Sequence, residues 1–321
     1  MRYARLEVDG QERVGVVIAE TISVATLQLF PVGTDLLAAA TARTAPADDD
    51  PGEIVSSDRE RFLPPVRPAS FRDFVAFEEH VQGAAAMTGN AEQAIAAWYE
   101  QPTYLYGSPH AAVGSGDPIA APPGSQALDF ELEVGVVIGR DGRDLTPEEA
   151  RDHIAGYVVV NDWSARDIQR HEMKGGLGPA KAKDFATTIG PWLVTPDELE
   201  PARVGDRLDL RMTVSINGVE YGSDSLAHMG WSFEELVAFA SRGAWVRVGD
   251  LLASGTCAGG SLAETWGRIG RQEPLPLQPG DLVTMTVDRL GTISNPVVAA
   301  SPERCSVPRA TPLAKLRTVV T

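Results

Sequence analysis

Cysteine and long apolar runs are both scarce in this chain of 321 residues. Its two cysteines, Cys257 and Cys305, lie far apart in the sequence, which argues against a disulfide framework and against a cysteine-ligated zinc site. No apolar run approaches the length that crosses a bilayer, and the N-terminus lacks the apolar stretch of a secretion signal. From these absences we expect a cytoplasmic protein with no membrane partner.

Positive charge is also in short supply. The net charge is −16 at pH 7, and only four of the 28 lysines and arginines are lysine. Nucleic acids and anionic lipids bind to basic surfaces, so we expect neither as a partner. Three of the lysines, Lys174, Lys181 and Lys183, fall within ten residues. Such a cluster is typical of an exposed loop, but it also suits an anionic substrate.

The residue pattern predicts a β-rich α+β fold. Apolar residues alternate over residues 4–8 and 14–18 on either side of Asp9-Gly10, which is a hairpin signal. Prolines at 64, 65 and 68 predict a boundary between a small β domain at 1–66 and a larger domain at 67–321. Short apolar runs and turns such as Asn217-Gly218 predict strands after residue 102. Helices are expected at 71–81, 91–99, 146–155, 165–172 and 232–241.

Acidic residues flank two of the β-prone segments. Glu131 and Glu133 precede the apolar run 134–138, and Asp162 follows the run that starts at Tyr157. Side chains alternate along a strand, so Glu131 and Glu133 would share a face about six to seven ångström apart. Because paired carboxylates repel each other unless a cation lies between them, these acids predict a divalent metal. An isolated acidic pair is also common on an exposed strand.

Two further pairs of residues allow more than one interpretation. A helix over 71–81 would bring Asp73 and His80 to one face, where a neutral imidazole would suit a general base. Alternatively, Ser70 and Asp73 form a capping box, and His80 is a surface residue. Arg166 and Gln169 at i, i+3 would point at one substrate group or at solvent. No Gly-x-Ser-x-Gly elbow is present, which argues against a serine hydrolase.

Five sequence runs stand out in the larger domain: LDFELEVGVVIGR, GYVVVNDWSARDIQR, LGPAKAKDFATTIGPWLV, GDLLASGTCAGG and GTISNPV. Together they resemble the fumarylacetoacetate hydrolase family, over residues 68–296. The resemblance implies a mixed β-roll or sandwich of the fumarylacetoacetase type behind a small β N-terminal domain, usually as a homodimer. One departure is Val75, where the enzyme that gives the family its name has tyrosine.

The resemblance also implies a set of site residues. The implied metal ligands are Asp73, Glu131, Glu133 and Asp162, and the implied metal is Mg²⁺, or else Ca²⁺ or Mn²⁺. The implied catalytic residues are His80, Glu264 and Lys183, of which His80 and Glu264 would activate water. The implied substrate-binding residues are Arg166, Gln169 and Thr256.

The activity implied by the resemblance is metal-dependent hydrolysis of a carbon–carbon bond in a 1,3-dicarbonyl acid. Fumarylacetoacetate, fumarylpyruvate or an acylpyruvate would be cleaved through a metal-stabilised enolate in the catabolism of aromatic compounds. Other members of the family isomerise or decarboxylate 2-hydroxyhepta-2,4-diene-1,7-dioate or decarboxylate oxaloacetate, and the motifs do not separate these reactions. The alternative from another class is a non-catalytic metal-binding protein.

Overall fold

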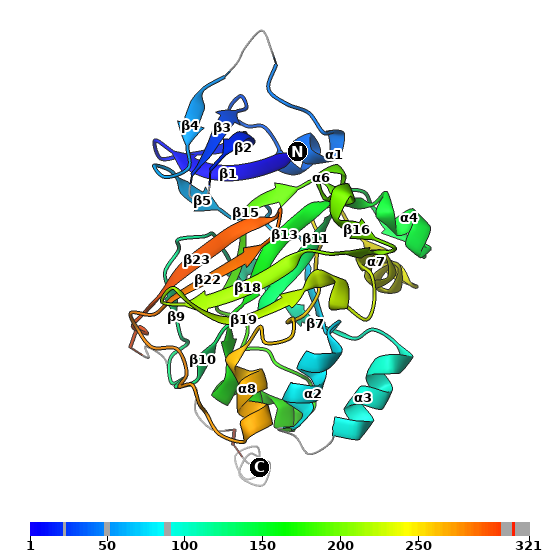
Figure 1. Ribbon diagram of the computed structural model, residues 1–321, viewed down its shortest axis with the longest axis vertical. Coiled ribbons are helices and arrows are strands. Elements are labelled where there is room, and N and C mark those ends of the chain that lie inside the picture. Colours follow the sequence, from blue (N-terminus) through cyan, green and yellow to red (C-terminus); the bar gives the residue numbers. More distant parts are fainter. Residues whose placement is uncertain (22–23, 48–51, 87–90, 303–309, 312–321) are drawn as a thin grey trace, which may run out of the picture.

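The structure is a computed structural model that describes residues 1–21, 24–47, 52–86, 91–302 and 310–311, and it is β-rich with helices at the periphery (Figure 1). Its largest sheet has twelve strands, ten of them on one continuous path. In spatial order these ten are β4 (Ile54–Ser56), β3 (Ala25–Leu29), β2 (Gln11–Glu20), β1 (Arg2–Val8), β15 (Thr187–Val194), β13 (Ile154–Asp162), β11 (Leu132–Ile138), β21 (Leu251–Ala253), β6 (Phe71–Phe74) and β7 (Tyr104–Gly107). The other two are β5 (Arg61–Leu63), beside β1, and β8 (Ala112–Val113), beside β15.

A second sheet of five strands packs on one face of the first. Its order is β19 (Val219–Ser225), β18 (Arg211–Ile216), β22 (Leu282–Val287), β23 (Gly291–Val298) and β9 (Ile119–Ala120). Residues of both sheets share one core, as Val136 and Val159 do with Met212 and Met285. Strands β11 and β13 are buried along their whole length, since a second apolar cluster with helix α1 covers their other face. The predicted fold class, a β-rich sandwich, is confirmed.

Helices lie at both ends of the sandwich (Figure 1). Helices α2, α3 and α8 gather at the end away from the N-terminal strands. The helices are α1 (Leu36–Ala42), α2 (Glu78–Ala86), α3 (Ala91–Glu100), α4 (Pro147–Arg151), α5 (Arg166–Glu172), α6 (Pro196–Leu199), α7 (Phe233–Ser241) and α8 (Leu262–Ile269). Two-stranded sheets are formed by β10 (Leu128–Asp129) with β14 (Ser164–Ala165), β12 (Gly142–Arg143) with β20 (Trp245–Val246), and β16 (Arg203–Val204) with β17 (Arg207–Leu208).

The N-terminal hairpin forms as the sequence predicts. Asp9 and Gly10 both have positive φ, 49° and 74°, which suits the two-residue turn between β1 and β2. At its start β1 also hydrogen-bonds with β15, where Tyr3 pairs with Leu193. The N-terminal strands therefore extend the large sheet, and the division into domains at 66/67 stays a prediction.

The predicted helix at 71–81 is wrong in its first half. Phe71–Phe74 is strand β6, all four residues are buried, and α2 begins only at Glu78. The strand pairs with β21 on one side and β7 on the other, and this pairing outweighs the helix-like spacing of the phenylalanines. A capping box of Ser70 and Asp73 is excluded for the same reason.

The other helix predictions hold with shifts at their ends. The helices expected at 91–99, 165–172 and 232–241 are α3, α5 and α7, and Ser232 caps α7. Helix α4 is shorter than predicted because β13 starts at Ile154. Helix α8, which the sequence pattern did not predict, is capped by Ser261.

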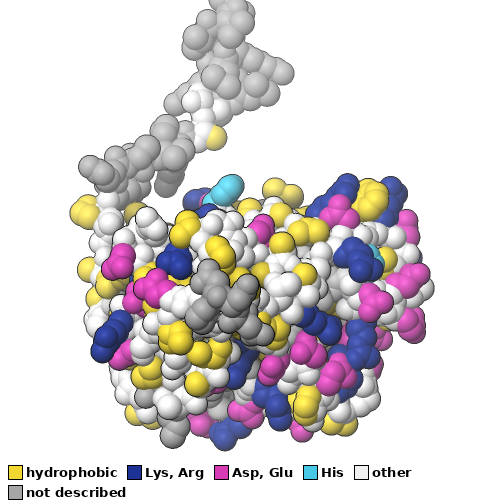
Figure 2. All heavy atoms as spheres, turned by 90° about the horizontal axis from the view of Figure 1, so that it is seen from above, with side chains coloured by type: hydrophobic (Ala, Val, Ile, Leu, Met, Phe, Trp, Pro, Cys, Tyr) yellow, Lys and Arg dark blue, Asp and Glu magenta, His cyan; other side chains and the backbone are white. Residues whose placement is uncertain are grey.

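The surface carries charges of both signs. On the face shown in Figure 2, Lys and Arg side chains are interspersed with Asp and Glu. In the described part of the chain no helix combines the length and hydropathy that crossing a bilayer requires.

Candidate active site

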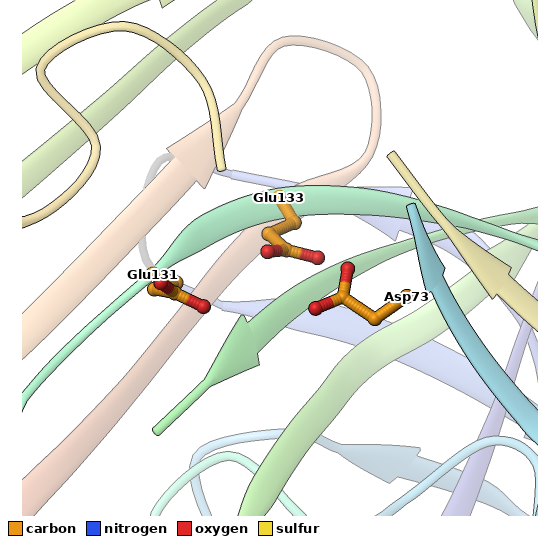
Figure 3. Close-up of side chains that lie close together, drawn as sticks. All are labelled: Asp73, Glu131 and Glu133. Atoms are coloured by element: carbon orange, nitrogen blue, oxygen red, sulfur yellow. The ribbon is translucent and has the colours of Figure 1, made fainter. Parts of the chain in front are cut away.

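Three buried carboxylates lie close together beside strands β6 and β11 of the large sheet (Figure 3). Asp73 lies on β6, Glu133 on β11, and Glu131 immediately before β11. One carboxylate oxygen from each lies within 4.8 Å of the others, and all three residues are buried. Strand β21 brings them together, because Ala253 pairs with Asp73 on one side and with Gly135 of β11 on the other.

Two of these carboxylates lack a partner on one oxygen. Among the described residues, no hydrogen-bond partner reaches Asp73 Oδ1 or Glu133 Oε2, although both atoms are buried. Burial, followed by the charge of neighbouring carboxylates, raises the pKa of Asp73 and of Glu133 well above their ordinary values. Unpaired buried carboxylate oxygens are costly, and hard oxygen ligands are what Mg²⁺, Mn²⁺ and Ca²⁺ prefer. The donor set therefore fits a divalent cation.

The ammonium group of Lys183 lies between Glu131 and Asp162. Its Nζ donates hydrogen bonds to Glu131 Oε2 and to Asp162 Oδ2, the second at 2.5 Å. Burial alone would lower the pKa of Lys183, but Asp162 and Glu131 outweigh it and raise this pKa, so the ammonium stays charged. Asp162 ends β13 as expected, yet its other oxygen accepts from Thr187 at 3.2 Å. Its carboxylate is outside the three-carboxylate group, and its role as a metal ligand stays a prediction.

Arg166 connects the three-carboxylate group to a further carboxylate, that of Asp129. Its Nε donates to Asp129 Oδ2 at 2.8 Å, its Nη2 lies 2.7 Å from Glu131 Oε1, and its Nη1 donates to Gln169 Oε1 at 3.0 Å. Burial would raise the pKa of Glu131, but Arg166 and Lys183 together hold it far below its ordinary value. Glu131 is therefore ionised at neutral pH.

Sequence reasoning assigned no role to Asp129, which orients Arg166. It is fully buried and also accepts from the backbone N–H groups of Leu262 and Ala263, at 2.8 and 3.0 Å. One carboxylate thus fixes both Arg166 and the first turn of α8. The available signal was its place in the acid-rich run DFELE.

His80 and Glu264 face each other from two different helices. His80 on α2 and Glu264 on α8 are both buried, and His80 Nδ1 lies 3.6 Å from Glu264 Oε2. The same oxygen accepts from the backbone N–H of Gly259 at 2.8 Å. The structure thus brings this predicted pair together, with Glu264 fixed from the glycine-rich loop.

A cavity of about 590 Å³ opens onto these groups. It is lined by eight of the ten predicted site residues, Asp73, His80, Glu131, Glu133, Arg166, Gln169, Lys183 and Thr256. The other two do not line it: Asp162 accepts a hydrogen bond from Lys183, and Glu264 lies beside His80. Thr256 Oγ1 donates to Glu133 Oε1 at 3.4 Å. The apolar part of the wall comprises Phe74, Val75, Leu105, Met173, Ala263 and Trp266.

A model of the family described as "fumarylacetoacetate (FAA) hydrolase C-terminal" matches residues 69–298. The chain belongs to this family. The resemblance seen in the sequence over 68–296 is thereby confirmed, and it covers every residue predicted for the site.

Relatives in the family differ in what they do. The chain is 32% identical over 241 residues to fumarylacetoacetase of Dictyostelium discoideum, covering 61% of this chain and 56% of that protein. It is 34% identical over 200 residues to oxaloacetate tautomerase YisK of Bacillus subtilis, covering 62% of each. Against the mitochondrial oxaloacetate tautomerase fahd2 of Xenopus laevis it is 37% identical over 188 residues, covering 58% and 54%. The chain thus spans little more than half the length of these relatives.

Solved structures agree on the fold. The fumarylacetoacetate hydrolase of Exiguobacterium antarcticum superposes with a TM-score of 0.71 at 28% identity, covering 93% of this chain and 99% of that one. The 5-carboxymethyl-2-hydroxymuconate delta-isomerase of Mycobacterium smegmatis superposes with a TM-score of 0.70 at 23% identity, covering 93% and 100%. Members of this family generally bind a divalent metal, which agrees with the buried acidic cluster.

Proposed function

We propose that this protein is a metal-dependent hydrolase that cleaves a carbon–carbon bond in a 1,3-dicarbonyl acid. The observation that supports this most is the single cavity that joins a carboxylate cluster fit for a divalent cation to the His80–Glu264 pair. Mg²⁺ is the proposed ion, and Mn²⁺ and Ca²⁺ suit the same oxygen ligands.

Each polar residue of the cavity has a proposed part in the reaction. Asp73, Glu131 and Glu133 would hold the metal, with Asp162 as a further candidate ligand. When bound, the metal polarises a carbonyl oxygen of the substrate. His80 would take a proton from water, and Glu264 would fix the orientation of the imidazole and offset its positive charge. The hydroxide would add to the carbonyl carbon, the carbon–carbon bond would break, and the enolate released would take up the proton held by His80.

The cations of the cavity would stabilise the charge that develops during cleavage. Lys183 uses two N–H groups on Glu131 and Asp162, which leaves its third donor for a substrate oxygen. Arg166 contributes positive charge beside it, and preorganised charge of this kind is a large part of catalysis. Gln169 and Thr256 line the same wall and would bind the substrate's carboxylate or carbonyl groups.

The assay that tests this function follows the ultraviolet absorbance of enolised keto acids. Metal-stripped protein is incubated with fumarylpyruvate, fumarylacetoacetate or acetylpyruvate, with and without Mg²⁺, and products are identified by mass. We expect metal-dependent loss of absorbance that yields two acids, and loss of this activity in His80→Ala. Turnover that continues without a divalent metal would contradict the proposal.

Oxaloacetate tautomerisation is a second candidate function. It is favoured by the two oxaloacetate tautomerases that are 34% and 37% identical over the matched regions. A base such as His80 next to a bound keto acid suffices to move a proton between carbon and oxygen. With oxaloacetate added to the substrates of this assay, the activity would change the enol absorbance of oxaloacetate without forming two acids. Metal binding without turnover of any of these acids would favour a non-catalytic role.

A further inference from the structure

The two carboxylate oxygens of Glu264 have different partners. Oε2 faces His80 and accepts from Gly259. Oε1 lies 2.6 Å from Nη2 of Arg268, one turn further along α8. Glu264 is only 3% exposed at its side chain, whereas Arg268 is 52% exposed. An arginine at the surface thus reaches inward to the buried partner of the candidate base.

Arg268 also lies between the two helices that carry this pair. Its Nη2 is 3.8 Å from Glu79 Oε2, and Glu79 directly precedes His80 on α2. Helix α2 lies very close to α8 at this point, as the space at Gly83 shows. A Cβ on Gly83 would lie only 2.5 Å from Cγ of Glu264. The position of Glu264 relative to His80 therefore depends on how α2 and α8 are held together, and Arg268 contacts acids on both helices.

Arg268 does not belong to the substrate cavity. It lines a separate outer cavity of about 380 Å³ together with Glu79, Gln82 and Gly83, and none of these four residues lines the substrate cavity. Arg268 therefore does not line the substrate cavity, and its contacts to Glu264 and Glu79 connect it to the His80–Glu264 pair.

We propose that Arg268 is a positioning residue that holds the Glu264 carboxylate in the orientation that faces His80. The proposal rests on the proposed role of the His80–Glu264 pair. A charge-assisted contact to guanidinium is strong and directional, and a buried carboxylate that loses its cation turns towards other donors. Glu264 would then no longer orient the imidazole of His80.

Replacement of Arg268 by alanine should lower kcat about 10- to 100-fold, the range typical of partners behind a catalytic group. KM and Mg²⁺ affinity should stay nearly unchanged, because Arg268 contacts neither the substrate cavity nor the acid cluster. Arg268→Lys should recover part of the loss. The matched control is Arg271→Ala, since Arg271 is 71% exposed and pairs with Glu273 just beyond α8; it should leave kcat unchanged.

Chemical rescue separates positioning from general damage to the fold. The outer cavity has room for a guanidinium ion, so added guanidinium chloride at low millimolar concentration should restore activity to Arg268→Ala. It should not raise the activity of the unsubstituted protein or of Arg271→Ala. Unchanged kcat in Arg268→Ala, or an equal effect in both variants, would overturn the proposal.

A second measurement works without turnover. Nuclear magnetic resonance of the His80 ring, assigned by its loss in His80→Ala, should show the same change of signal in Arg268→Ala as in Glu264→Gln. A His80 signal that moves in Glu264→Gln but not in Arg268→Ala would contradict this inference alone. Full activity in both His80→Ala and Glu264→Gln would instead refute the proposed function.

Discussion

Lys183 holds the carboxylates of Glu131 and Asp162 together through one ammonium group. The two acids come from neighbouring strands, where Leu132 pairs with Asn161, and all three side chains are almost inaccessible to solvent. The buried cation thus offsets part of the negative charge that the acid cluster places inside the protein.

Replacement of Lys183 by methionine should therefore make the stability of the protein depend more strongly on bound metal. Removing one partner of a buried ion pair typically costs about 3–5 kcal/mol, because the remaining charges are left without compensation. We expect a lower Tm for metal-free Lys183→Met and a larger rise in Tm on addition of Mg²⁺ than in the unsubstituted protein. Lys181→Met is the control, since Lys181 forms an exposed pair with Asp184. An equal rise in both variants would contradict this role of Lys183.

The metal-free protein should lose stability as the pH rises. Burial, and then the nearby carboxylates, raise the pKa of Asp73 and Glu133 in the folded state, so the folded protein binds more protons than the unfolded chain. The contribution of these two carboxyl groups to stability is then greatest below their pKa in the unfolded chain, about 4. It falls as the pH climbs towards their pKa in the folded protein. The depressed pKa of Glu131 acts the other way, but its contribution is already complete above about pH 5.

Urea unfolding between about pH 5 and pH 8 measures this effect. With a chelator present, the free energy of unfolding should fall across this range, and Glu133→Gln should reduce the slope. With saturating Mg²⁺ the slope should flatten, because the bound ion stabilises the ionised carboxylates. If the free energy of unfolding of the metal-free protein rose over this range, the raised pKa of Asp73 and Glu133 would be contradicted.

Gly83→Ala should separate the candidate base from its partner. In most helices this substitution stabilises, by about 1 kcal/mol. Here the new Cβ would lie 2.5 Å from Glu264 Cγ, so the Glu264 side chain or α2 itself must shift. We expect lower kcat and a loss of about 1–3 kcal/mol of stability, the usual cost of overpacking. Gly175→Ala serves as the control, since a Cβ there meets no atom within 4 Å.

Local sequence pattern predicted those parts of the site that depend on adjacent residues. Strand alternation placed Glu131 and Glu133 together, and Asp162 does end a strand. The pattern failed at Asp73, because the spacing of the neighbouring phenylalanines imitates a helix. Its strand forms only by pairing with β21 from a distant part of the chain.

The remaining contacts depend on packing that no local pattern contains. Which acid pairs with Lys183, and which one fixes Arg166, is decided by the approach of separate strands and helices. The meeting of His80 and Glu264 was expected only from the resemblance to the family, since no periodic signal connects α2 with α8. The contacts of Arg268 to Glu79 and Glu264 become evident only once the positions of both helices are known.

The most direct test of the central claim is calorimetric titration of metal-stripped protein with Mg²⁺ and Mn²⁺. We predict one ion bound per chain, with affinity at least about tenfold weaker in Asp73→Asn and Glu133→Gln, because each removes a charged oxygen ligand. Asp162→Asn measures in the same experiment whether the acid paired with Lys183 also contributes. Absence of binding to the unsubstituted protein, or unchanged affinity in Glu133→Gln, would contradict the assignment of this cluster as the metal site.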